Sequence, residues 1–326
     1  MGMADVAKAA GVSIASVSRV LNGKPGVSQE LIEQILRAAD QVGYVPRKGR
    51  RGIRVGSVAV LVPDVDSRAL RTALMARLLH GVEPYLREHE VRTVVTGLSA
   101  PDRPPDFVNP HDVDGVIIRT AYPYEQLDLR LGTLPHVWVF ELAGTPQWGD
   151  LVIPDNQAVG RLAAQSLCSR GRRRLCYVAS GPNAPATIER GQAFAHHARQ
   201  RGATVSRLIE DWPDSVPTER LLAGEDVPDG IFVFVGGETA AVAALHHALA
   251  DRGLRPGRDV ELVACANEVG SLGALRPAPA WIDIQPEAIG RAAVDMLLWR
   301  MKSPGEPQRT MTVAPRLVES HGGGYD

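Results

Sequence analysis

The sequence predicts an α/β protein in two parts, a three-helix unit at the N-terminus and a larger body of doubly wound parallel sheets. Apolar residues recur with helical spacing over about residues 1–45, and from Val55 on they form β-type runs that alternate with amphipathic helices. The first part is basic and the rest of the chain is acidic. Because 326 residues are too many for one small core, we expect a small domain followed by a large one.

Composition places the chain among ordinary globular proteins. Hydrophobic residues make up 44% and charged residues 22%, which argues against extensive disorder. No apolar run is long enough to span a membrane, and Asp5 and Lys8 interrupt the stretch in which a secretion signal needs apolar residues. The three cysteines have no metal-ligand spacing. We therefore expect a cytoplasmic protein without a metal or other cofactor.

The first 45 residues contain signals for three short helices. An Ala-rich segment begins at Asp5 and ends before Gly11, a typical helix-stopping residue. Ser13 can cap a second helix of about eight residues, and Ser28 can cap a third that ends at Gly43. The apolar faces of the second and third helices consist of Val17, Val20 and Leu21, and of Leu31, Ile32, Ile35, Leu36 and Ala39. Two short helices joined by a tight turn and braced by a third are typical of a helix-turn-helix unit.

The body alternates between expected strands and helices. The expected strands cover residues 58–62, 91–95, 115–118 and 137–140, and then 175–179, 231–235 and 260–264. The expected helices lie near residues 72–88, 157–170, 187–201, 239–252 and 287–301. This alternation predicts mostly parallel, doubly wound sheets, and about 270 residues suggest two lobes.

One connection of the first lobe is unusually short. Four prolines, at 101, 104, 105 and 110, lie between the strand that ends near Thr96 and the strand that starts at Gly115. Proline excludes a full crossover helix there. We expect an extended, Pro-rich strap over that face of the sheet.

The two parts differ in charge. Residues 1–54 hold nine Lys and Arg against four Asp and Glu, whereas the remaining residues hold 27 basic and 33 acidic ones. A basic unit on an acidic body is typical of a domain that binds a polyanion. The alternative is a solvated basic helix face, and charge by itself does not exclude it.

A helix-turn-helix reads DNA with the N-terminal end of its second helix. Ile14 and Ala15 stand at that end and suit apolar contact with a thymine methyl group. Ser16 and Ser18 can reach a base or a phosphate, and Arg19 can bind either guanine or phosphate. The alternative for the whole segment is a three-helix cap with a structural role only.

The segment DVAKAAGVSIASVSRVLNGKPGVSQELIEQILRAADQVGYVP, residues 5–46, resembles the headpiece of the lactose-repressor/galactose-repressor (LacI/GalR) family. The resemblance implies a homodimeric transcriptional repressor that binds a palindromic DNA operator. Residues 1–45 would be the DNA-binding domain, 46–54 a basic hinge, and 55–326 an effector-binding and dimerisation domain. Ser13, Asn22 and Tyr44 join the expected DNA contacts on the same ground.

The hinge departs from the family pattern Asn-x-x-Ala-Arg-x-Leu. Arg51 matches the Arg, and Ile53 matches the Leu that is wedged into the minor groove. Arg47 and Arg50 replace Asn and Ala, while Gly49 and Gly52 each weaken a helix by roughly 1 kcal/mol. We expect an affinity that depends strongly on phosphate contacts, with a flexible basic linker as the alternative.

The body is similar, more loosely, to the family's effector domain, which is related to periplasmic sugar-binding proteins. The similar segments are VLVPD (60–64), VDGVII (113–118), PDNQAVGRLAAQSL (154–167), TIERGQAF (187–194) and IQPEAIGRAAVDMLL (284–298). The resemblance implies one lobe over about 55–153 and 286–303, and another over about 154–285 and 304–326. In the cleft between them, Arg190 would hold a polar group of a small-molecule effector. The other candidate effector contacts are Asp64, Asp155, Glu238 and Asn267.

Two cleft segments lack the acceptors of the family pattern. Residues 236–238 read Gly-Gly-Glu where relatives have Ala-Asn-Asp. Residues 264–267 read Ala-Cys-Ala-Asn, so that Ala266 replaces an Asp that often binds sugar hydroxyls. These changes argue against a simple sugar as effector and leave two alternatives, a different ligand or a pocket without a ligand.

Other classes of protein find little support. The sequence contains no Gly-x-Ser-x-Gly elbow, Walker loop, dinucleotide fingerprint or His-Glu-x-x-His, so we do not expect an enzyme. The pairs His196–His197 and His246–His247 occupy adjacent helical positions and are not expected to share a metal ion. The N-terminal unit argues against a transport-type binding protein.

Overall fold

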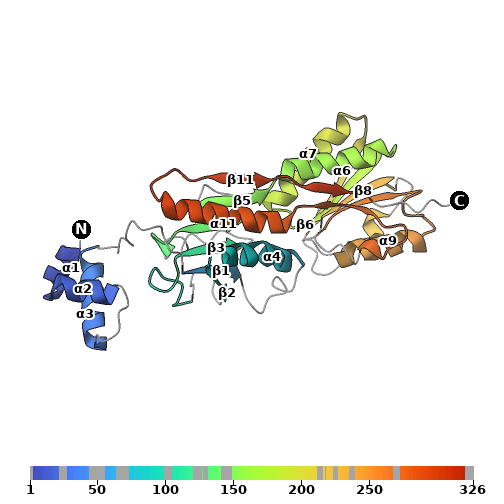
Figure 1. The fold of residues 1–326 in the computed structure, drawn as a ribbon. Helices are drawn as coiled ribbons and strands as arrows, with labels where there is room; N and C mark the ends of the chain where they lie inside the picture. The colour runs from blue at the N-terminus through green and yellow to red at the C-terminus, as the bar shows by residue number, and fades with distance from the viewer. Residues whose placement is uncertain are drawn as a thin grey trace. The chain divides into compact units, whose positions relative to one another are not determined.

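The computed structural model describes residues 3–21, 28–43, 56–63, 73–98, 105–119, 127, 131–140, 149–210, 216, 218–222, 227–234, 239–266 and 272–319. The chain divides into two compact units, Met1–Arg54 and Val55–Asp326 (Figure 1). We refer to the first unit as the headpiece and to the second as the body.

The headpiece consists of α1 (Met3–Ala10), α2 (Ile14–Leu21) and α3 (Gln29–Gln41), which confirms the three predicted helices. Gly11 ends α1 with a φ of +63°, a backbone conformation that glycine adopts at little cost. The backbone N–H of Ser16 donates to Ser13 Oγ at 3.0 Å, and that of Leu31 donates to Ser28 Oγ at 3.3 Å. Both predicted serine caps are therefore confirmed.

A small apolar core holds the three headpiece helices together. It comprises Val6, Ala7, Ala10, Val17, Ile35, Ala38 and Ala39. Gln34 Nε2 donates to the backbone oxygen of Ala10 at 2.9 Å and so binds α3 to the end of α1. Because α1 and α3 brace it on one side, α2 leaves its opposite side exposed.

The body contains two six-stranded sheets, as the two-lobe prediction requires (Figure 1). The first sheet has the order β11-β5-β4-β3-β1-β2, and all its strands are parallel. The second has the order β12-β10-β9-β8-β6-β7 and is parallel except for β12. The strands are β1 (Ser57–Pro63), β2 (Arg92–Leu98), β3 (Gly115–Arg119), β4 (His136–Val139), β5 (Asp150–Pro154), β6 (Arg174–Ser180), β7 (Thr204–Glu210), β8 (Gly230–Phe234), β9 (Glu261–Cys265), β10 (Ala280–Asp283), β11 (Thr310–Val313) and β12 (Arg316–Val318).

Helices cover the faces of both sheets, as expected for a doubly wound fold. They are α4 (Ala73–Glu88), α6 (Asn156–Ser169), α7 (Pro185–Arg199), α8 (Thr218–Leu221), α9 (Thr239–Asp251) and α11 (Pro286–Lys302). Figure 1 shows α4 beside α11 in the first lobe and α6 beside α7 in the second, and each pair is in close contact.

The C-terminal segment corrects one predicted boundary. Residues 304–326 were expected in the second lobe, but β11 pairs in parallel with β5, so Thr310–Val313 belong to the first lobe. The chain enters the second lobe only at β12, which pairs with β10. The sequence carries no sign of this strand because Thr310, Met311 and Thr312 are exposed and give no apolar run.

Among the described residues, each lobe has a helix crossing that only glycine permits. A Cβ on Gly160 of α6 would lie 2.3 Å from the backbone oxygen of Arg190 on α7. A Cβ on Gly290 of α11 would lie 2.5 Å from the backbone oxygen of Leu78 on α4. The two glycines stand in similar segments, Ala-Val-Gly-Arg at 158–161 and Ala-Ile-Gly-Arg at 288–291. The two lobes thus repeat the same close crossing, a correspondence that sequence analysis missed.

The connection between β2 and β3 contains no helix in its described part, residues 105–114. These residues form turns rather than the expected extended strap, and the Asn109 Oδ1 atom accepts the backbone N–H of His111 at 2.8 Å. Val108 and Val113 are buried with residues of β1, β3 and β4, so the segment covers the sheet as predicted. Prolines 101 and 104 lie outside the described residues.

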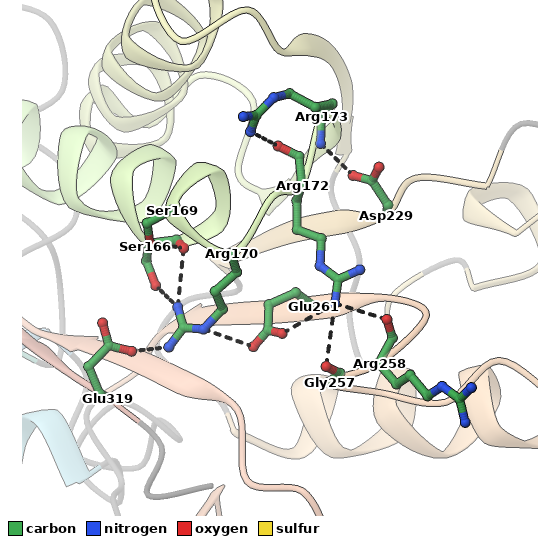
Figure 2. Close-up of polar contacts among 10 residues, drawn as sticks. All are labelled: Ser166, Ser169, Arg170, Arg172, Arg173, Asp229, Gly257, Arg258, Glu261 and Glu319. Carbon is green, nitrogen blue, oxygen red and sulfur yellow. Dashed lines mark hydrogen bonds and ion pairs between the residues drawn. The ribbon is translucent and has the colours of Figure 1, made fainter.

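Figure 2 shows a charged network at the amino ends of the second sheet. The buried carboxylate of Glu261 lies 3.7 Å from Arg170 Nε and 3.8 Å from Arg172 Nη2, and Arg170 also pairs with Glu319. Burial raises the pKa of Glu261, although the two arginines act to lower it. Asp229 Oδ1 accepts the backbone N–H groups of Arg173 and Arg174, each at 2.9 Å. These arginines therefore stabilise the fold, and their charge gives no reason to propose a second polyanion site.

Candidate functional site

The N-terminal end of α2 is the exposed end of a well-packed helix. Val17 is completely buried in the headpiece core, whereas Ile14 is 52% exposed. Ala15 and Arg19 are also exposed, and Ser16 and Ser18 are half-buried. The helix therefore presents its first two residues and Arg19 to solvent, which is the arrangement that entry into a major groove requires.

The hydroxyl groups of Ser13 and Ser16 lie 2.9 Å apart, so either one can donate to the other. Because Ser13 Oγ also accepts the backbone N–H of Ser16, it already serves as the cap of α2. Its role as a DNA contact stays a prediction. The other predicted DNA contacts, Asn22, Tyr44, Arg47, Arg50, Arg51 and Ile53, lie outside the described residues.

Arg190 is the best-defined polar residue at the carboxyl ends of the second sheet. Its side chain is buried, with only 3% of the residue exposed. The guanidinium carbon lies 4.2 Å from the centroid of the Phe234 ring, at the end of β8, and Nη1 lies 3.5 Å from the sulfur of Cys265, at the end of β9. Ligands of open α/β sheets bind at this edge of the strands, and a planar guanidinium suits the recognition of a polar group.

Asn156 orients this arginine and was missed by sequence analysis. Its Oδ1 accepts a hydrogen bond from Arg190 Nε at 2.9 Å, and its Nδ2 donates to Glu189 Oε2 at 3.0 Å. Asn156 is itself buried, with 4% exposed, so the guanidinium is held in one orientation from behind. The only sequence signal was its place in the family-like segment 154–167.

Of the other four candidate effector contacts, the structure describes only Asp155. Asp155 Oδ1 accepts the backbone N–H of Ala158 at 2.8 Å and so serves as the N-cap of α6. Asp64, Glu238 and Asn267 lie outside the described residues. Of the five predicted effector contacts, the described structure therefore places only Arg190 among the residues at the ends of β8 and β9.

Two other kinds of feature are absent from the described ranges. No group of three or more His, Cys, Asp or Glu in those ranges is arranged to hold a metal ion. None of the described helices combines the length and the apolar character needed to cross a membrane.

A helix-turn-helix headpiece joined to a two-lobed body with parallel sheets defines a regulator that combines a DNA-binding domain with a periplasmic-binding-protein-like domain. Residues 2–47 match the family described as bacterial regulatory proteins, lacI family, and residues 164–321 match the periplasmic binding protein-like domain. The HTH-type transcriptional regulator MalR of Streptomyces coelicolor is 30% identical over 292 residues, which cover 85% of this chain and 75% of that protein. The chain belongs to the LacI/GalR family of DNA-binding transcriptional regulators, which are not enzymes.

Further comparisons extend over nearly the whole chain. The HTH-type transcriptional regulator CelR of Thermobifida fusca is 27% identical over 331 residues, 97% of each protein. A solved transcriptional regulator CelR–cellobiose complex has a TM-score of 0.68 at 23% identity and covers 99% of this chain and 100% of that one. The lac repressor dimer bound to operator and the anti-inducer ONPF has a TM-score of 0.67 at 20% identity, over 98% of each chain. At these identities the two structures support the fold assignment.

Proposed function

We propose that this regulator is a repressor that acts in the cytoplasm and binds a palindromic operator as a homodimer. The observation that carries the proposal is the exposed N-terminal end of α2, where Ile14 and Ala15 are available for contact with base edges. The lac repressor, whose fold the chain shares, binds its operator as a dimer. Two headpieces related by two-fold symmetry would read half-sites about one helical turn apart, in an operator of roughly 14–20 base pairs.

The roles of the three segments follow from this proposal. Residues 1–45 would read the operator, residues 46–54 would form the hinge, and residues 55–326 would bind the effector and the second subunit. The proposed contacts to DNA are Ser13, Ile14, Ala15, Ser16, Ser18, Arg19, Asn22, Tyr44, Arg47, Arg50, Arg51 and Ile53. The arginines of the hinge would supply much of the affinity by neutralising phosphates.

The proposed effector is a small molecule whose polar group lies against Arg190. CelR binds cellobiose and another structural neighbour binds ribose, which supports a ligand in the body. Ala266, which is 2% exposed, stands where the family pattern has a carboxylate for sugar hydroxyls. We therefore propose a ligand other than a simple sugar, and a body without a ligand is the alternative.

Arg51→Ala should weaken binding to all DNA sequences to a similar extent, because a phosphate contact carries no sequence information. The slope of log affinity against log salt concentration is negative, and loss of one phosphate contact should reduce its magnitude by about 1. Titrations of labelled operator and of unrelated DNA at several salt concentrations measure both quantities. Arg199→Ala, an exposed change on α7, is the control, and an unchanged slope for Arg51→Ala would contradict a phosphate contact.

Ala15→Gln should change which operator is preferred, because glutamine can pair with adenine where alanine can contact only a thymine methyl. The new preference at one position of each half-site should amount to about 1–3 kcal/mol. Binding to a panel of operators with single base changes measures it. Ala9→Gln places the same side chain at an exposed position of α1 and should leave the preference unaltered. An equal loss for every operator would rule out base contact at residue 15.

A further inference from the structure

An arginine of the first lobe is bound to two carboxylates at the point where the chain passes from β10 to α11. Arg77 Nη1 and Nη2 donate to the two oxygens of Asp283 at 3.0 and 2.9 Å. Arg77 Nε and Nη2 donate to the two oxygens of Glu287 at 2.6 and 2.7 Å. One guanidinium therefore makes two bidentate ion pairs, the geometry in which such pairs are strongest.

The two carboxylates belong to different lobes. Arg77 lies on α4, and Glu287 lies in the first turn of α11, which packs on α4 in the first lobe. Asp283 is the last residue of β10, which pairs with β9 and β12 in the second sheet. The pair with Glu287 is therefore internal to the first lobe, whereas the pair with Asp283 joins the two lobes.

Asp283 also fixes the backbone where the chain passes from β10 to α11. Its Oδ1 accepts the backbone N–H of Gln285 at 2.8 Å. Gln285 has a φ of +58°, a left-handed conformation that costs energy in any residue except glycine. Gln285 Nε2 donates to the backbone oxygen of Ala314, which lies in the segment that connects β11 of the first lobe to β12 of the second. The carboxylate that Arg77 holds is therefore part of the connection between the lobes.

The network is sufficiently shielded to matter energetically. The side chains of Arg77, Asp283 and Glu287 are 22%, 17% and 27% exposed. Burial acts to lower the pKa of the Arg77 guanidinium, but the hydrogen bonds to Glu287 and Asp283 outweigh it and the pKa is raised. Exposed ion pairs contribute little because water and salt screen them, and that screening is reduced here.

We propose that Arg77 is a positioning residue that sets the relative orientation of the two lobes through its ion pair with Asp283. Helix α4 carries Arg77 on the first lobe, and the pair with Asp283 fixes the end of β10 against it. A change in lobe orientation has to stretch the pair with Asp283 and leaves the pair with Glu287 intact. This inference rests on the proposed function only for its consequence, a change in operator affinity.

Spin labels on Cys residues at positions 88 and 192 would report the distance between the lobes in the full-length protein. The labels are introduced through Glu88→Cys in the first lobe and Gln192→Cys in the second, since Glu88 and Gln192 are both exposed. The natural cysteines are buried and should not react with the spin label. Asp283→Asn removes the charge of the inter-lobe pair and keeps an oxygen for Gln285. Glu287→Gln is the matched control, because it neutralises the other carboxylate bound to the same guanidinium.

We expect Asp283→Asn to broaden or shift the distribution of label distances and Glu287→Gln to leave it unchanged. Arg77→Gln, which keeps Asp283 intact, should reproduce the effect and serves if Asp283→Asn does not fold. Asp283→Asn and Arg77→Gln should also change operator affinity by about five-fold or more. Equal distance distributions in all variants, or equal broadening by both carboxylate changes, would overturn the proposal. Failure of the unaltered protein to bind DNA would instead contradict the proposed function, since the distances do not depend on it.

Discussion

Gly160→Ala is expected to lower the free energy of unfolding of the body by about 2 kcal/mol. The new methyl group would lie 2.3 Å from the backbone oxygen of Arg190 and 2.7 Å from the backbone nitrogen of Phe194. Neither atom can move without displacing α7. Alanine gains about 1 kcal/mol over glycine in helix propensity, which is less than the cost of separating the two helices.

The same substitution should disturb the candidate ligand site, because the clash is with the backbone of Arg190 itself. Chemical denaturation followed by circular dichroism measures the loss of stability. Gly305→Ala is the control, since nothing lies within 4 Å of the added carbon there, and it should change stability by no more than about 0.5 kcal/mol. Equal stability of the two variants would show that α6 and α7 do not cross as closely as described.

Asp150→Ala is expected to lower the free energy of unfolding by about 3–5 kcal/mol. The Asp150 side chain is fully buried and forms a bidentate pair with Arg300, at 2.6 and 2.8 Å. It also accepts the backbone N–H of Arg309 at 2.8 Å and so anchors the start of β11. The hydrogen bonds to Asp150 raise the pKa of Arg300, which keeps its charge when the carboxylate is removed.

The large cost arises because a largely shielded guanidinium loses its bidentate carboxylate partner, so an exposed pair provides the right comparison. The Arg87–Glu83 pair on α4 has side chains that are 71% and 47% exposed. Glu83→Ala should therefore cost about 0.5 kcal/mol or less. If Asp150→Ala costs no more than Glu83→Ala in the same denaturation experiment, the described burial of the Asp150–Arg300 pair is wrong.

Local signals explain why the headpiece could be predicted from sequence. Gly11, Ser13 and Ser28 set the ends of helices through contacts with residues close by in the chain. The central strands of the body were predicted because both of their faces are buried, which produces continuous apolar runs such as 58–62 and 231–233. Such features depend on short stretches of sequence.

The features that sequence analysis missed depend on residues far apart in the chain. The exposed strand β11 exists because it pairs with β5, more than 150 residues earlier. The Arg77 network joins residues separated by 206 and 210 positions. Asn156 gained its role from the approach of α7, which brings Arg190 against it. These contacts are products of packing, and no local pattern predicts them.

In vitro selection of bound sequences from a pool of random double-stranded DNA tests the central claim most directly. The full-length protein should enrich one palindromic sequence of roughly 14–20 base pairs, with symmetric half-sites that the two copies of α2 read. Exchange of Ile14 and Ala15 for other residues should alter the enriched half-site. Enrichment of no sequence, or of a sequence without two-fold symmetry, would contradict a dimeric regulator that reads DNA through this helix.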